Sequence, residues 1–175
     1  GFAVPESKRS RVAFIHTRDA QGKLVEESAD GYNTRLTVAS PGLYSGGGGL
    51  FSTAADYARF AQMLLNGGQL DGVRLLSRKS VELMTRDHIA NLAQPHPFGQ
   101  RDHGFGLGVR VLTQPGESSS PCSVGCFGWD GMATTNVQID PKERTVALVL
   151  FQHLPFNEGE ILSYYTNGYY SALAD

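Results

Sequence analysis

The clearest sign of architecture lies in residues 127–151, which read FGWDGMATTNVQIDPKERTVALVLF. Three parts of this stretch, Phe127–Trp129, Met132–Ile139 and Thr145–Phe151, are rich in the β-branched and aromatic residues that favour strands. The residues Asp140-Pro-Lys-Glu-Arg144 between the last two parts are typical of a tight turn. The stretch therefore predicts neighbouring antiparallel strands.

Working outward from this stretch, the sequence predicts one more strand and a final helix. Upstream, apolar residues alternate with other residues, which is typical of a half-buried strand; they are Phe105, Leu107, Val109 and Val111. Downstream, Glu158–Ala174 has apolar residues at helical spacing, so we expect a helix packed on one face of the sheet. An antiparallel sheet with packing helices gives an α+β fold class.

Two further helices are expected before the sheet. Thr53 followed by Asp56 resembles a capping box, and Gly67-Gly68 marks the end of that helix. The side chains of this helix that are expected to face the protein core are Tyr57, Ala61, Leu64 and Leu65. Ser77 is the expected N-cap of a second helix, and the apolar side chains expected on that helix are Val81, Leu83 and Met84.

The remaining upstream part is expected to hold little regular structure. An Asp71-Gly72 turn separates the two expected helices. Residues 1–41 are interpreted as a short helix or turn, a weak hairpin around Gln21-Gly22, and a long irregular loop. All 175 residues are expected to form a single unit.

Composition excludes several classes of partner. The chain is 41% hydrophobic and 18% charged, which suits one globular core, and its net charge of −2 comes from charges interspersed along the sequence. No basic stripe suggests nucleic-acid binding. The longest apolar stretch, Val146–Phe151, is too short for a membrane span, so we expect a soluble protein, with cytoplasm and periplasm left open.

The histidines and cysteines suggest neither a metal site nor a cofactor. Cys122 and Cys126 are interpreted as two unrelated free thiols, with a local disulfide as the alternative. The five histidines do not supply metal-ligand spacing. Four of them are expected on surface loops, namely His16, His88, His96 and His103, and His153 is expected to be structural.

A complete nucleophilic site is not found in the sequence. No Gly-x-Ser-x-Gly elbow occurs, and none of the four lysines, Lys8, Lys23, Lys79 and Lys142, is preceded by serine at the Ser-x-x-Lys spacing. Tyr165-Thr166-Asn167 fits a Tyr-x-Asn pattern by letters, but its place on the expected last helix indicates core packing. We therefore do not assign it a catalytic role.

The order of several modest motifs resembles the serine β-lactamase-like superfamily. They are Gly46–Gly49, the helix with Ser-Thr-Ala-Ala-Asp-Tyr-Ala-Arg-Phe, Leu-Asn-Gly-Gly, Leu-Leu-Ser, Gly-Phe-Gly-Leu-Gly, Phe-Gly-Trp-Asp-Gly and the last hairpin and helix. The pattern is most similar to the family VIII carboxylesterases, with class C β-lactamases and D-Ala-D-Ala peptidases as relatives. The resemblance implies the C-terminal portion of that fold, with Ser-x-x-Lys and Tyr-x-Asn in an upstream segment.

The resemblance also implies site residues. Trp129-Asp130-Gly131 stands where the family has its third motif, Lys-Thr-Gly in β-lactamases and Trp-Gly-Gly in many of the esterases. Tryptophan cannot pair with a substrate carboxylate as lysine does, which favours a neutral ester packed on Trp129. Asp130 departs from both patterns, and we expect it either to repel anionic substrates or to hydrogen-bond locally. Met132 is implied as the backbone oxyanion donor.

The loop opposite this motif is expected to line the cleft. Its substrate-binding candidates are Tyr44, Ser45, Gly46, Gly47 and Gly48, where missing side chains would leave room for a ligand. The alternative is a flexible loop that precedes the next helix.

The resulting hypothesis is a carboxylesterase-type serine hydrolase that forms an acyl-enzyme, with the nucleophile outside this chain. Its expected partners are the N-terminal segment of the same protein and a small ester, with a further copy of the chain as an option. No cofactor is expected. The alternatives are a β-lactamase or D-Ala-D-Ala peptidase, and a non-catalytic binding or interaction domain of the same fold.

Overall fold

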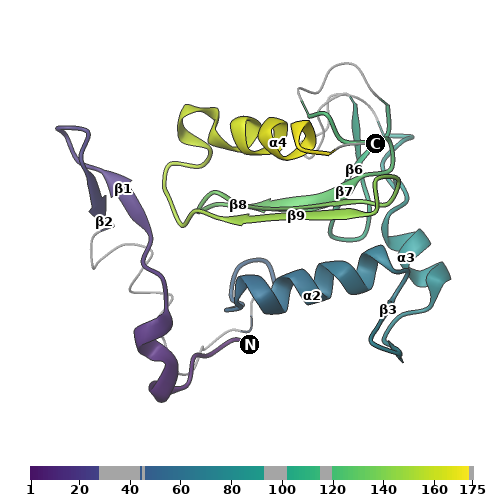
Figure 1. Cartoon of the computed structure of the whole chain (residues 1–175), viewed down its shortest axis with the longest axis horizontal. Helices are drawn as coiled ribbons and strands as arrows, with labels where there is room; N and C mark the ends of the chain where they lie inside the picture. The colour runs from purple at the N-terminus through teal and green to yellow at the C-terminus, as the bar shows by residue number, and fades with distance from the viewer. Residues whose placement is uncertain (28–43, 45, 93–101, 115–119, 174–175) are drawn as a thin grey trace.

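The computed structural model describes residues 1–27, 44, 46–92, 102–114 and 120–173 (Figure 1). Its centre is a five-stranded antiparallel sheet in which the strands follow the order of the sequence. The strands are β5 (His103–Phe105), β6 (Arg110–Leu112), β7 (Phe127–Gly131), β8 (Thr135–Asp140) and β9 (Thr145–Leu150). The predicted α+β class is confirmed, because each of the last three strands pairs with its sequence neighbour.

Helices lie on both faces of this sheet. Helix α2 (Ala54–Leu65) runs below the sheet and α4 (Ile161–Ser171) runs above it, as Figure 1 shows. Alternate strand residues, including Val137, Ile139 and Phe127, join Ala61 and Leu64 of α2 in the main hydrophobic core. Because neighbouring strand residues point to opposite faces, the residues between them face α4.

Helix α2 begins and ends where the sequence predicts. The Thr53 side chain accepts a hydrogen bond from the Asp56 N–H, and the Gly68 N–H donates to the Met63 carbonyl in a glycine-terminated end. Ala61 and Leu64 are buried, as predicted. Tyr57 is instead 37% exposed, because it lies in the first turns of the helix and its ring packs edge-on against Phe60 near the surface.

The second expected helix is α3 (Arg78–Met84), and Ser77 is its N-cap. Val81 is buried in the core, whereas Leu83 points outward and is 45% exposed. Before α3, strands β3 (Gln69–Leu70) and β4 (Val73–Arg74) form a short hairpin around the predicted Asp71-Gly72 turn.

The N-terminal part contains the predicted short helix and hairpin. They are η1 (Glu6–Arg11), β1 (His16–Arg18) and β2 (Leu24–Glu26). The His16 N–H donates to the Gln152 carbonyl, and the Leu154 N–H donates to the His16 carbonyl, so β1 is attached to the segment after β9. The predicted irregular loop up to residue 41 lies largely outside the described residues.

The predicted bounds of two strands were wrong. The stretch from Phe105 to Val111 is two strands joined by a tight turn, in which the Gly106 N–H donates to the Val109 carbonyl and Gly108 has φ +84°. Leu107 therefore lies at the turn and is 52% exposed. Met132 does not begin β8 either, because residues 132–134 form the turn after β7.

The last helical segment is slightly shorter than predicted. A turn of 3-10 helix, η2 (Glu158–Glu160), precedes α4. In the described part of the chain, no helix combines the length and the apolar character needed to cross a membrane.

Candidate functional site

The last three residues of β7 lie at an uncovered edge of the sheet. Strand β6 pairs only with Phe127 and Gly128, whereas β8 pairs with β7 along its whole length. The Leu112 N–H donates to the Cys126 carbonyl, so the backbone groups of even-numbered residues face β6. Asp130 consequently directs its backbone N–H and C=O past the end of β6, where no strand among the described residues pairs with it.

Met132 follows β7 directly and its side chain is 50% exposed. Among the described residues, no backbone carbonyl accepts a hydrogen bond from its N–H. A turn N–H at the end of an uncovered strand edge is a geometry that can hold an anionic oxygen.

Trp129 lies on the rim of this edge and is 41% exposed. The Phe105 ring meets it edge to face, with the centroids 5.2 Å apart and an interplanar angle of 82°. The Arg110 guanidinium carbon lies 5.8 Å from the Trp129 ring centroid. These two neighbours orient the indole and leave part of its surface free for an apolar group.

The Asp130 carboxylate is held by two side chains. Arg110 Nη1 lies 2.7 Å from its Oδ2, and Asn136 Nδ2 donates to its Oδ1 over 2.6 Å. Asp130 therefore hydrogen-bonds locally, and its expected effect on anionic substrates stays a prediction. Its negative charge is balanced by Arg110.

The glycines of β7 allow close packing against β8. A Cβ added at Gly131 would lie 2.1 Å from Thr135 Oγ1, and one at Gly128 would lie 1.9 Å from the Val137 carbonyl oxygen. The clash at Gly128 is with backbone and excludes a larger side chain, whereas the clash at Gly131 is with the Thr135 hydroxyl. Trp129 and Asp130 thus lie between two glycines where β7 packs closely against β8.

The glycine-rich loop is open. Gly46, Gly47 and Gly48 form an exposed turn, and a Cβ added at Gly46 or Gly48 would meet no atom within 4 Å. Tyr44 is 70% exposed and its ring packs against Phe2, not against β7. Ser45 lies outside the described residues. The contacts seen for this loop thus do not join it to Trp129, and its place in a cleft stays a prediction.

The comparisons with known proteins agree with this architecture. The Beta-lactamase family model matches residues 1–167. The chain belongs to this family. Protein Rv1367c of Mycobacterium tuberculosis is 37% identical over 162 residues, which cover 89% of this chain and 39% of that protein. A putative D-alanyl-D-alanine carboxypeptidase of Escherichia coli O157:H7 is 34% identical over 122 residues, covering 66% of this chain and 25% of its own length.

Solved structures share the fold of this Beta-lactamase family chain. EstCE1, described as a hydrolase with promiscuous acyltransferase activity, superposes with a TM-score of 0.78 at 19% identity over 97% of this chain and 46% of its own. Simvastatin synthase (LovD) from Aspergillus terreus has a TM-score of 0.75 at 23% identity, over 97% of this chain and 45% of its own. The chain matches the C-terminal portion of the fold. It spans about two fifths of the length of Rv1367c.

A cavity of about 200 Å³ lies on the α4 side of the sheet in this Beta-lactamase family chain. The side chains around it include those of His103, Arg110, Cys122, Asp130, Asn136 and Thr166, but neither Trp129 nor Met132 lines it. The cavity thus shares Arg110 and Asp130 with the open edge of β7. Sequence reasoning missed it because its walls come from β5 to β8 and α4.

The two thiols beside this cavity are free, as predicted, but they are not unrelated. Cys122 and Cys126 are both buried and are hydrogen-bonded to each other. This hydrogen bond, opposed by burial and assisted by Ser120, lowers the pKa of Cys122 to about 7. The same contact, together with burial, raises the pKa of Cys126. The four-residue spacing of the cysteines was the available signal for this pair.

The histidines differ partly from expectation. His103 is buried rather than on a surface loop, and its Nδ1 lies 2.8 Å from the Asp102 carboxylate, which is also buried. His153 has the predicted structural role, since its Nε2 lies 2.7 Å from Glu158 Oε2. No group of three or more potential metal ligands is found among the described residues.

Proposed function

We propose that this chain is part of a carboxylesterase-type serine hydrolase that works through an acyl-enzyme. The observation that carries the proposal is a half-exposed Trp129 near the end of β7, together with the N–H of Met132 in the turn that follows β7. Trp129 would pack on the apolar part of an ester. The Met132 N–H would donate to the oxygen that becomes negative when the ester carbonyl is attacked.

In this proposal the nucleophile belongs to a segment upstream of residue 1. A serine hydroxyl there attacks the ester carbonyl carbon, its proton passes to a base, and the alcohol leaves with a proton. Water then attacks the acyl-serine, which releases the acid and restores the serine. The membership in a family of hydrolases supports this sequence of steps, and so does the short length of the chain relative to its relatives.

The ester preference rests on Trp129 in place of a lysine. An indole offers apolar surface and a ring face, but no positive charge for a substrate carboxylate. The competing activity is a D-Ala-D-Ala carboxypeptidase, which the Escherichia coli relative supports by its description. A non-catalytic domain of the same fold is the third candidate.

The test compares the 175-residue chain with the full-length gene product that contains it. We expect the chain alone to be inactive on 4-nitrophenyl butyrate, and the full-length protein to hydrolyse this ester faster than a β-lactam or a D-Ala-D-Ala peptide. Robust ester hydrolysis by residues 1–175 alone would contradict the assignment of the nucleophile. A full-length product without Ser-x-x-Lys would favour the non-catalytic domain.

Trp129→Ala provides the residue-level test of the same proposal. Removing the indole should lower kcat/KM for the ester by about tenfold or more, because the apolar contact with the substrate is lost. Trp129→Phe keeps an aromatic surface beside Phe105 and should lose less. Equal kcat/KM values for the wild type and the alanine variant would show that Trp129 does not contact the ester.

A further inference from the structure

Arg110 connects the two central residues of the β7 edge. It is the first residue of β6, so its side chain lies where the pairing between β6 and β7 stops. There its guanidinium reaches the Asp130 carboxylate at 2.7 Å and lies 5.8 Å from the Trp129 ring centroid. Successive residues of a strand point to opposite faces, and Arg110 contacts both because it stands at this end.

Both charged groups are partly accessible. The Arg110 side chain is 31% exposed and that of Asp130 is 19% exposed. A cation at this position would attract an anionic ligand on Trp129, since two unit charges about 6 Å apart near a protein surface interact by about 1 to 3 kcal/mol. The paired carboxylate opposes that attraction.

Asn136 holds Asp130 in place for this role. Its Nδ2 donates to Asp130 Oδ1 from the neighbouring strand, and the register places the two residues directly opposite each other. The carboxylate therefore has one oxygen for Asn136 and the other for Arg110. This arrangement leaves the positive charge of Arg110 neutralised at the rim of Trp129.

We infer that Asp130 is a specificity-determining residue, which excludes anionic substrates from the Trp129 edge by neutralising Arg110 and thereby selects uncharged esters. The inference rests on the proposed function for its substrate class. The ion pair in which Asp130 neutralises the Arg110 cation beside Trp129 does not depend on where the nucleophile lies.

The activity test uses Asp130→Asn in the full-length protein. Asparagine keeps an oxygen for Asn136 but carries no charge, so Arg110 becomes an unpaired cation. Two matched substrate pairs place a carboxylate on either side of the ester: mono-4-nitrophenyl adipate against 4-nitrophenyl hexanoate, and 4-acetoxybenzoate against its methyl ester. We expect the ratio of kcat/KM for the anionic to the neutral member to rise about tenfold in at least one pair.

Two control variants separate this effect from general changes. Asp130→Asn combined with Arg110→Gln should return the ratio to the wild-type value, because the exposed cation is removed. Asp71→Asn releases Arg59 of α2 from a 2.6 Å ion pair with the β3–β4 turn, away from Trp129, and should leave the ratio unchanged. Asp71 has φ +48°, a conformation that asparagine tolerates well.

A binding measurement keeps the inference testable if no ester is hydrolysed. The 175-residue chain has a single tryptophan, so the Trp129 indole N–H signal can be followed by NMR during titration with 4-acetamidobenzoate, adipic acid monoanilide and their uncharged counterparts. We expect Asp130→Asn to gain about tenfold in relative affinity for an anionic member. If Asp130→Asn gains affinity for an anionic ligand but no ester is hydrolysed, the proposed function is refuted and the role of Asp130 stands. Ester turnover with unchanged ratios in both pairs would overturn the role of Asp130.

Discussion

Cys122 and Cys126 flank a tight turn in which the Cys126 N–H donates to the Ser123 carbonyl and Gly125 has φ +90°. The turn brings the two thiols together beside the sheet, and Cys126 leads directly into β7. A thiol that donates to its neighbour stabilises the thiolate of that neighbour, which lowers the pKa of Cys122 to about 7. Of the two thiols, Cys122 is therefore expected to hold more thiolate at neutral pH.

The alkylation of Cys122 by iodoacetamide should follow this pKa. Because the thiolate is the nucleophile, the rate should rise with pH to a plateau, with a midpoint near 7. Cys126→Ser provides the comparison, since a hydroxyl at this position changes the hydrogen bond and should move the midpoint. Peptide mass spectrometry at several pH values measures the rate. A midpoint near 9, equal in both proteins, would contradict the role of the thiol pair.

Strand β7 depends on glycine for its position against β8. A Cβ at Gly128 would lie 1.9 Å from the Val137 carbonyl oxygen, and backbone atoms of a central strand cannot move away at low cost. Gly168, on α4, offers the opposite case, because a Cβ there meets nothing within 4 Å. Alanine substitutions at these two glycines therefore separate the effect of a steric clash from the effect of helix propensity.

We expect Gly128→Ala to lower the free energy of unfolding by about 2 kcal/mol or more. Gly168→Ala should raise it by about 0.5 to 1 kcal/mol, because alanine is the better helix former. Urea denaturation followed by circular dichroism measures both variants. A Gly128→Ala chain as stable as the wild type would show that β7 and β8 are less closely packed than the contacts indicate.

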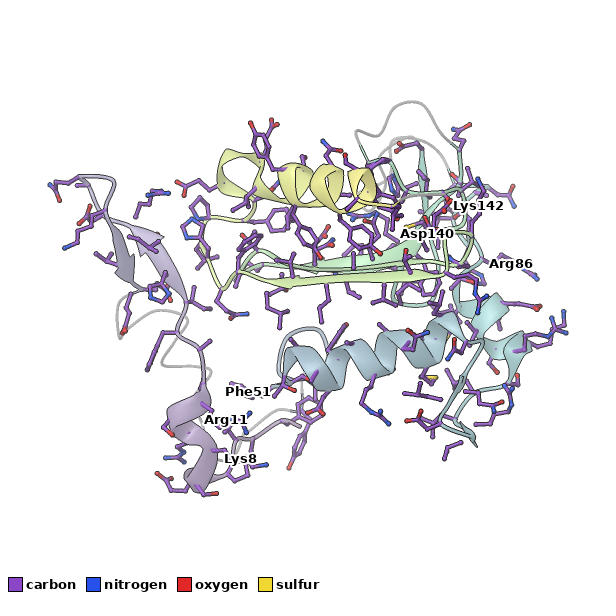
Figure 2. All side chains as sticks on the ribbon, in the orientation of Figure 1. Lys8, Arg11, Phe51, Arg86, Asp140 and Lys142 are labelled. Atoms are coloured by element: carbon purple, nitrogen blue, oxygen red, sulfur yellow. The ribbon has the colours of Figure 1, made fainter. Side chains whose placement is uncertain are left out.

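Asp140, at the end of β8, connects three separate parts of the molecule, and Figure 2 shows it on the sheet near the C-terminal end of α4. Its carboxylate accepts hydrogen bonds from the Ser123 N–H in the cysteine turn, from the Lys142 and Glu143 N–H groups in the β8–β9 turn, and from the Tyr170 hydroxyl of α4. Burial acts to raise its pKa, but these hydrogen bonds outweigh burial and lower it. Burial raises the pKa of Tyr170, so its hydroxyl stays a donor.

Asp140→Asn should therefore destabilise the whole fold, by about 2 kcal/mol at pH 7. The lowered pKa gives the sign of the pH dependence: the carboxylate stabilises the folded state above the ordinary aspartate range and loses this effect as the pH falls through its lowered value. The difference between wild type and variant should shrink below about pH 4. Urea unfolding at pH 7 and pH 3 tests this, and a constant difference would contradict it.

Local signals were sufficient for much of the secondary structure. Thr53 and Ser77 cap their helices by bonds to residues three positions away, and Gly68 ends α2 for the same short-range reason. Residue types that favour strands, with a turn between them, indicated the strands around Val137. Alternation gave the wrong extent between Phe105 and Val111, where Gly106 and Gly108 allow a turn inside an apolar pattern that looks continuous.

The electrostatic character of the candidate site depended on contacts between distant residues. Trp129, Asp130 and Met132 could be singled out from a motif, since their order along β7 is a property of the chain. The pairing of Asp130 with Arg110, 20 positions away, and of Asp140 with Tyr170, 30 positions away, follows from strand register and helix packing. A hydrogen bond or ion pair acts over a few ångströms, and only folding sets which distant groups come that close.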